Sequence, residues 1–140
     1  MTHRFACRVY YEDTDLAGIV YYANYLKFIE RARSEWVRGL GIDQVRLRAD
    51  TGVVFAVRRV EADYLRPARF DDLLEVATSV AAVGPALISL RQRVLRDGAL
   101  LFDATVTLVA LSASGRPVRL PEALRKAAET GLRGGGTGAQ

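Results

Sequence analysis

The feature that most constrains the fold is a change of apolar spacing near residue 52. Between residues 21 and 40 the apolar side chains recur at steps of three and four, which predicts one amphipathic helix about 28 Å long. Gly39 and Gly41 supply the signals that end it. The side chains of this apolar stripe are Tyr25, Phe28, Ile29, Ala32, Trp36 and Leu40.

Strand-like spacing precedes and follows this helix. One strand is expected over residues 4–11, and four more are expected over 53–65, over 74–83, between Pro85 and Asp97, and over 102–112. In the strand after Pro85, Gln92 is the polar exception on an otherwise apolar face. The dipeptide Asp97-Gly98 predicts a tight hairpin before the last strand. A short helical turn over 42–50 and a helix over 121–130 complete the prediction.

These elements predict an α+β fold. An antiparallel sheet with one apolar face needs a cover, and the chain has one long helix to provide it, so we expect the sheet to wrap around that helix. With 140 residues the chain is expected to form a single domain over 1–130. The segment 131–140, GLRGGGTGAQ, is expected to be a disordered C-terminal tail.

Composition narrows the chemistry. The chain has one cysteine, Cys7, and one histidine, His3, so it can form no internal disulfide and no histidine-rich metal site. Hydrolysis would have to rest on carboxylates, hydroxyls or backbone dipoles, and no metal or cofactor is expected. The net charge of +4 comes without a basic run or basic-aromatic interleaving, so no nucleic-acid partner is expected. Because no secretory signal and no apolar stretch of about 18 residues is present, we expect no membrane segment and a cytoplasmic location.

An acidic loop lies just before the predicted long helix. Glu12, Asp13 and Asp15 fall within four positions and are followed by Gly18. A helix N-terminus presents free N–H groups that can polarise a carbonyl, and a nearby carboxylate can act as nucleophile or general base. The simpler interpretation is that Asp13, Thr14 and Asp15 are turn and cap residues.

The segment 10–36, YYEDTDLAGIVYYANYLKFIERARSEW, resembles the signature of the 4-hydroxybenzoyl-CoA thioesterase family of hotdog-fold proteins. Within that family it is most similar to the Tol–Pal-associated acyl-CoA thioesterase branch. A looser similarity runs over 5–125 and includes YLRPA at 64–68, Asp71-Asp72 and Gly115-Arg116-Pro117.

The resemblance implies a hotdog fold, in which a five- or six-stranded antiparallel sheet wraps a central helix. It implies hydrolysis of a small or medium acyl-CoA to free acid and CoA. It also implies homo-oligomers, as dimers or as dimers of dimers (homotetramers), with sites at the subunit interface. The alternative function is a non-catalytic module that binds acyl-CoA or an acyl carrier protein, acting as an adaptor linked to the cell envelope.

By motif position, the resemblance assigns Asp15 as the catalytic carboxylate and the backbone N–H of Tyr22 as the group that faces the thioester carbonyl. Gly18 would let the loop approach a ligand closely. Tyr21 would line the acyl pocket or belong to the core. Asn24 would order the loop, contact substrate or cap the helix.

The chain departs from the branch at one position. Many branch members carry a histidine where this chain has Tyr22, so a mechanism that needs that imidazole cannot operate here. The backbone donor does not depend on the side chain, so hydrolysis is expected to survive. Hotdog hydratases place a histidine five positions after the aspartate, where this chain has Val20, which disfavours hydratase chemistry.

Coenzyme A carries phosphates, so arginines are expected around the site. Arg91 and Arg93 alternate with Leu90 and Val94, which predicts that they point away from the helix, toward solvent or another subunit, where they would bind substrate. For each arginine the alternative is a solvated strand face. The full set of candidates is Arg58, Arg59, Arg66, Arg91, Arg93 and Arg116.

Overall fold

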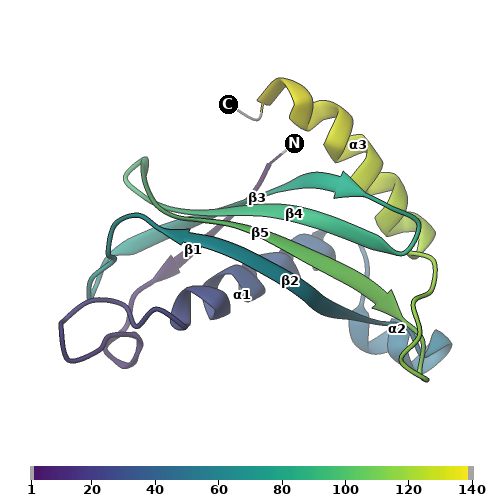
Figure 1. Cartoon of the computed structure of the whole chain (residues 1–140), viewed down its shortest axis with the longest axis horizontal. Coiled ribbons are helices and arrows are strands. Elements are labelled where there is room, and N and C mark those ends of the chain that lie inside the picture. Colours follow the sequence, from purple (N-terminus) through teal and green to yellow (C-terminus); the bar gives the residue numbers. More distant parts are fainter. Residues whose placement is uncertain (1, 139–140) are drawn as a thin grey trace.

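Over the residues that the structure describes, the chain folds into one curved antiparallel sheet and three α-helices (Figure 1). The computed structural model describes residues 2–138, and the side chains of residues 2–132. The elements in chain order are β1 (His3–Arg8), a single 3-10 turn (Tyr11–Asp13), α1 (Asn24–Gly39), α2 (Gln44–Thr51), β2 (Val54–Tyr64), β3 (Leu73–Val83), β4 (Leu87–Arg96), β5 (Ala99–Leu111) and α3 (Glu122–Gly138). The strand order is β1-β3-β4-β5-β2, with every neighbouring pair antiparallel.

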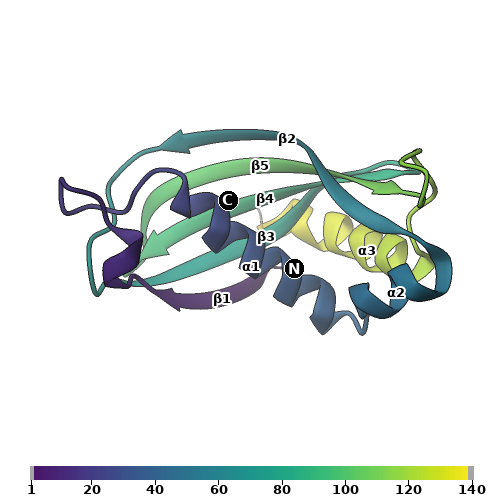
Figure 2. The same cartoon turned by 90° about the horizontal axis from the view of Figure 1, so that it is seen from below.

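The sheet wraps around α1, as predicted. Figure 2 shows α1 lying across the concave face of the sheet. Alternate side chains of β4 and β5 are buried against it, and the intervening ones are not. The buried side chains of α1 are Tyr25, Phe28, Ile29, Ala32 and Val37. The α+β class and the five-stranded form of the prediction are therefore confirmed.

The hairpin between β4 and β5 follows its sequence signal. Asp97 and Gly98 both have positive φ, at 51° and 79°. Consecutive positive φ values match the right-handed twist of two adjacent strands, which is why Asp-Gly is favoured at this kind of turn. The turn sets the register that places the inner face of β5 over α1.

The long helix begins later than predicted. Residues 21–23 continue the apolar pattern, but the backbone N–H of Tyr21 donates to the carbonyl of Asp13 at 2.9 Å, which holds Tyr21 in the loop. Asn24 is then the first helical residue. Tyr22 therefore lies in the turn that leads into α1, and not within the helix.

The C-terminal helix α3 extends past residue 130. Its described backbone is helical through Gly138. Residues 131–138 are therefore helical, although they were expected to belong to a disordered tail. Residues 139–140 lie outside the described residues. The helix passes close to β3, because a Cβ added at Gly131 would lie 3.3 Å from Cγ2 of Val80. Leu124 and Ala128 join the core from this helix. Across the described residues, no helix is long and apolar enough to cross a membrane.

Candidate active site

The loop between β1 and α1 is held by bonds within itself. The backbone N–H of Tyr10 donates to Oδ2 of Asp13 at 2.8 Å, and Oγ1 of Thr14 donates to the carbonyl of Tyr11 at 2.8 Å. Asp13 and Thr14 thus serve as turn residues, which is the simpler of the two roles considered for this acidic cluster.

The carbonyl of Asp13 ties the loop to the start of α1. It accepts one hydrogen bond from the backbone N–H of Tyr21 and one from Nδ2 of Asn24, both at 2.9 Å. Of the three roles considered for Asn24, the structure shows that it orders the loop. Tyr21 is half exposed and faces the cavity described below.

Asp15 closes a tight loop of its own. Its backbone N–H donates to the carbonyl of Ile19, and its carbonyl accepts from the N–H of Gly18, both at 2.9 Å. Gly18 has φ +80°, with nothing within 4 Å of a built Cβ. The backbone conformation, and not a crowded approach, is therefore what favours glycine here.

The carboxylate of Asp15 has one engaged and one free oxygen. Oδ1 accepts a hydrogen bond from the backbone N–H of Ala17 at 2.9 Å. Oδ2 takes part in no hydrogen bond made by the described residues. The first contact orients the carboxylate, and the second oxygen is left available for chemistry.

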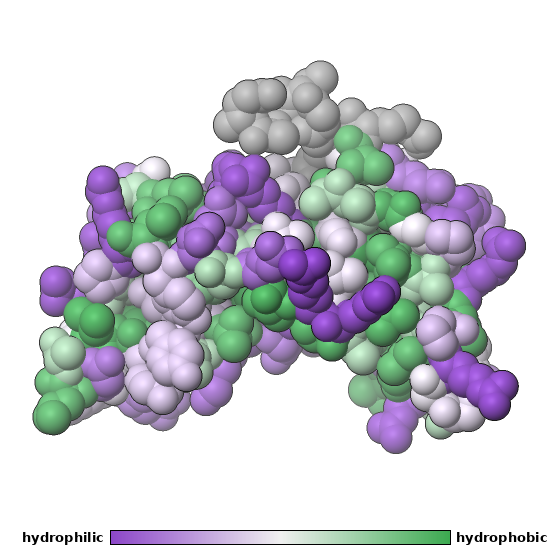
Figure 3. Space-filling view, in the orientation of Figure 1, coloured by the Kyte–Doolittle hydropathy of each residue, from purple (hydrophilic) through white to green (hydrophobic). Residues whose placement is uncertain are grey.

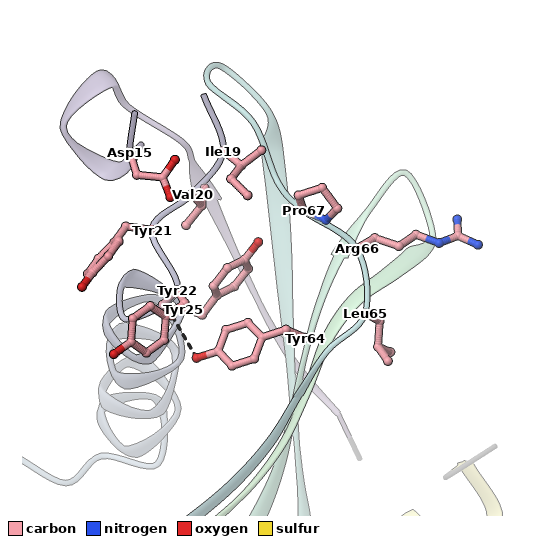
Figure 4. Close-up of a pocket in the computed structure, with 10 residues that line it drawn as sticks. All are labelled: Asp15, Ile19, Val20, Tyr21, Tyr22, Tyr25, Tyr64, Leu65, Arg66 and Pro67. Atoms are coloured by element: carbon pink, nitrogen blue, oxygen red, sulfur yellow. Dashed lines mark hydrogen bonds between the residues drawn. The ribbon is translucent and has the colours of Figure 1, made fainter. Parts of the chain in front are cut away.

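Asp15 lies at the wall of a cavity of about 380 Å³ (Figure 4). The close-up shows its side chain directed from the loop toward the space between the start of α1 and the segment 65–67. The lining residues are Asp15, Ile19, Val20, Tyr21, Tyr22, Tyr25, Tyr64, Leu65, Arg66 and Pro67. Among the residues that the structure describes, no three His, Cys, Asp or Glu side chains are grouped to share a metal ion.

Tyr22 also lines this cavity, at the turn that leads into α1. Within the described part of the chain, the N–H groups of Tyr22 and Ala23 make no hydrogen bond. They precede α1 directly, where the helix dipole adds partial positive charge. The carbonyl of Tyr22 accepts a hydrogen bond from the hydroxyl of Tyr64 at 2.9 Å. A carbonyl oxygen placed here would meet donors with no other partner.

An aromatic cluster forms the inner wall. The ring of Tyr25 stacks on Phe102 with centroids 5.0 Å apart, and the ring of Tyr64 meets both of them edge-on. The hydroxyl of Tyr25 accepts from the N–H of Ala68 at 3.0 Å. Burial raises the pKa of the Tyr25 phenol above its usual value, so the hydroxyl stays protonated at neutral pH. The sequence analysis placed Tyr25 only in the apolar stripe of the helix. The signal that could have identified it as a cavity residue is its hydroxyl, a polar group within that stripe.

A second hollow of about 700 Å³ is lined largely by the same loop, and Asp15 borders this one too. Tyr11 and Phe70 approach across it with ring centroids 6.0 Å apart, and Leu16 is fully exposed at its rim. Figure 3 shows apolar side chains among polar ones at the end of the molecule that carries this loop. Asp15 therefore lines two hollows, each with aromatic side chains in its wall.

Arg91 and Arg93 lie on the face of β4 that points away from α1, as predicted. Arg91 donates two hydrogen bonds to Asp103, at 2.9 and 3.2 Å, and these hydrogen bonds raise the pKa of its guanidinium. Nε of Arg93 lies 3.8 Å from the same carboxylate. Neither arginine lines the cavity at Asp15 within this chain, whereas Arg66 does.

The chain is similar to proteins of known family. The model of the Thioesterase superfamily matches residues 17–103. Acyl-CoA thioesterase YbgC of Haemophilus influenzae is 41% identical over 124 residues, covering 88% of this chain and 91% of that protein. Acyl-CoA thioester hydrolase YbgC of Escherichia coli is 40% identical over 125 residues, covering 88% and 90%.

The fold is shared with solved structures as well. The probable thioesterase of Bartonella henselae superposes with a TM-score of 0.83 at 36% identity, covering 86% of this chain and all of that one. The family model spans more than half of the chain, and its match begins within the loop that carries Asp15 and includes the start of α1. On the strength of both comparisons, the chain belongs to the thioesterase superfamily.

Proposed function

We infer that this chain is an acyl-CoA thioester hydrolase and that the cavity at Asp15 is where it acts. The function is supported by the superfamily match and by two relatives, named acyl-CoA thioesterase and acyl-CoA thioester hydrolase, that cover most of the chain. The observation that carries the site is that two residues line one cavity: Asp15, whose carboxylate has a free oxygen, and Tyr22, whose N–H has no partner among the described residues. The products are a free acid and CoA.

The chemistry follows from these two groups. The carbonyl oxygen of the thioester accepts a hydrogen bond from the N–H of Tyr22, which stabilises negative charge on that oxygen as the carbonyl carbon is attacked. Oδ2 of Asp15 either removes a proton from the attacking water or attacks the carbon itself to form a mixed anhydride that water then cleaves. In both routes the C–S bond breaks and CoA leaves as the thiolate, which takes up a proton.

The backbone donor explains how the chain can hydrolyse thioesters with Tyr22 at the position where many branch members have histidine. The N–H that faces the carbonyl belongs to the main chain, so the side chain can change while the donor stays. The cavity of about 380 Å³ and its four tyrosine rings suit a small or medium acyl group.

We further propose a homo-oligomer, as a dimer or a dimer of dimers, with sites between chains. β2 is an edge strand of eleven residues with one side unpaired in the sheet. A long free edge invites pairing with another chain. Light scattering that gives only a 15.4 kDa particle would contradict this proposal. We also propose membership of the Tol–Pal-associated branch, which the signature at 10–36 supports. A cytoplasmic location and an acyl carrier protein as an alternative carrier complete the proposal.

The decisive experiment is steady-state hydrolysis of an acyl-CoA panel by wild type and Asp15→Asn. Loss of the base or nucleophile should lower kcat at least about 100-fold while the fold is kept. Asp50→Asn makes the same change at an exposed position of α2 and should keep full activity. A fully active Asp15→Asn protein would refute the site. Saturable acyl-CoA binding by wild type with no thiol release would instead support the binding-module alternative.

Arginine variants test how CoA is held. We propose that Arg66, at the cavity, contacts phosphate, and that Arg91 and Arg93 are further candidates on the outer face of the sheet. Arg66→Met should raise KM about tenfold, the usual effect of losing one charge-assisted contact. If Arg91→Met and Arg93→Met leave KM unchanged, those two arginines serve only their pairing with Asp103.

A further inference from the structure

A single side-chain hydrogen bond joins the last residue of β2 to the turn that leads into α1. The hydroxyl of Tyr64 donates to the carbonyl of Tyr22 at 2.9 Å, the dashed line in Figure 4. The two residues are 42 positions apart, and Tyr64 comes from an edge strand of the sheet. This bond therefore connects the far side of the cavity to the donors of the proposed oxyanion site.

The bond acts on one of two peptide groups that flank Tyr22. The peptide on its N-terminal side is already held, because the carbonyl of Tyr21 accepts from the N–H of Asn24 at 2.8 Å. The peptide on its C-terminal side joins the carbonyl of Tyr22 to the N–H of Ala23, and Tyr64 holds that carbonyl. The N–H of Tyr22 belongs to the first peptide and the N–H of Ala23 to the second, so the bond from Tyr64 fixes the N–H of Ala23 and restrains the backbone on the C-terminal side of Tyr22.

The same bond strengthens one of the two donors. A hydrogen bond to a peptide carbonyl polarises the whole amide, so the N–H of Ala23 becomes a better donor when Tyr64 engages the carbonyl of Tyr22. Neither N–H has a partner among the described residues, so both remain free for a carbonyl oxygen of substrate.

The ring of Tyr64 is aimed by its neighbours. It meets Phe102, Tyr25 and Tyr22 edge-on, with centroids at 4.9, 5.5 and 6.2 Å. Such contacts favour a defined orientation of the ring. Burial, reinforced by the phenols of Tyr22 and Tyr25, raises the pKa of Tyr64 above its usual value. The hydroxyl therefore keeps its proton at neutral pH and acts as a donor.

We propose that Tyr64 is a positioning residue for thioester hydrolysis, acting through the main chain of Tyr22 and making no covalent contribution itself. The proposal rests on the proposed function of the cavity. Its role differs from that of Tyr25, whose hydroxyl accepts from the N–H of Ala68 and so does not touch the peptides that flank Tyr22.

The test is Tyr64→Phe, which keeps the aromatic ring and removes only the hydroxyl. Misaligned donors weaken stabilisation of the transition state more than binding of the ground state, so kcat should fall about tenfold while KM stays within about twofold. Tyr10→Phe makes the same change at an exposed tyrosine outside the cavity and should leave both constants unchanged. Each variant is assayed well below its own measured Tm, so that unfolding does not enter the rates.

Asp15→Asn, measured alongside, separates this inference from the proposed function. If Asp15→Asn is fully active, the cavity is not the site and the proposed function of this cavity fails. If Asp15→Asn is inactive but Tyr64→Phe keeps kcat within about twofold of wild type, only the role of Tyr64 is overturned. A raised KM with unchanged kcat would also overturn it, because that result makes the hydroxyl a substrate contact.

Discussion

Gln92 of β4 donates a hydrogen bond through Nε2 to the main-chain carbonyl of Ile29 in α1, at 2.8 Å. The same nitrogen donates to Oγ1 of Thr78 at 3.0 Å, and Oε1 accepts from Nη1 of Arg33 at 3.0 Å. Gln92 and Thr78 are the buried polar residues of an otherwise apolar core. The network thus fixes where α1 lies along the sheet, and the turn that carries the donors of the site leads directly into α1.

Replacing Gln92 with methionine should destabilise the fold by about 1–3 kcal/mol. Methionine keeps most of the volume, but the hydroxyl of Thr78 and the guanidinium of Arg33 lose their partner. Burial lowers the pKa of Arg33, which shows that its charge is already costly to hold there. Urea unfolding measures the change.

A double-mutant cycle provides the control for that variant. Thr78→Val removes the other side of one bond at nearly constant shape. Because both residues belong to one network, the two changes combined should cost less than the sum of each alone, by at least about 0.5 kcal/mol. Strict additivity would mean that the bond between them contributes nothing.

Gly18→Ala should weaken both stability and activity. At φ +80° a Cβ is strained by about 1–2 kcal/mol, and the strain falls on the loop that orients Asp15. Gly39→Ala is the matched change, because Gly39 is helical, without positive φ, and has open space around it. It should raise stability by about 0.4–1 kcal/mol and leave activity alone. Equal thermal shifts for the two variants would contradict this account of Gly18.

Much of the fold could be predicted because its signals are local. The stripe on α1, the alternation on β4 and β5, and the Asp97-Gly98 turn all follow from periods of 3.6 and 2 and from turn chemistry. The start of α1 could not be placed from the sequence. Tyr21 is held out of the helix by its hydrogen bond to the carbonyl of Asp13, eight residues earlier, and no local pattern indicates that bond.

Only the part of the site whose residues lie close together in the sequence could be predicted. Asp15, Gly18 and the turn before α1 lie within eight positions of one another, so one motif contains them. Tyr64 comes from a strand 42 residues later and Gln92 reaches a helix 63 residues earlier, and no local pattern indicates such partners. Gln92 stood out in the sequence only as a polar exception on an apolar face.

Asp72→Asn should make the stability of the protein less dependent on acid pH. Burial acts to raise the pKa of Asp72, but the hydrogen bonds from the N–H of Arg69 at 2.8 Å and from Arg96 at 2.7 Å outweigh it and leave the pKa lowered. A lowered pKa adds stability above the unfolded-state value of about 3.9, and this stability is lost as pH falls through the native value. The difference in Tm between wild type and variant should therefore be largest near neutral pH and vanish in strong acid. Asp71→Asn, the same change one residue earlier at an exposed position, is the matched control.

The thiol of Cys7 should react at least about tenfold more slowly in the native protein than after unfolding, at a pH near 8. Burial raises its pKa to about 11, with Arg31 opposing and Asp13 reinforcing the effect, whereas an unfolded cysteine titrates near 8.5. Because the reactive species is the thiolate, the native protein presents little of it at that pH. Cys7 is the one cysteine of the chain, so the release of thionitrobenzoate from Ellman's reagent reports on it alone.

The same raised pKa means that this thiol's contribution to stability is complete below about pH 8.5 and is lost as pH rises toward 11. If the thiol reacted equally fast in the native protein and in guanidinium chloride, Cys7 would not be shielded by its surroundings in the folded protein.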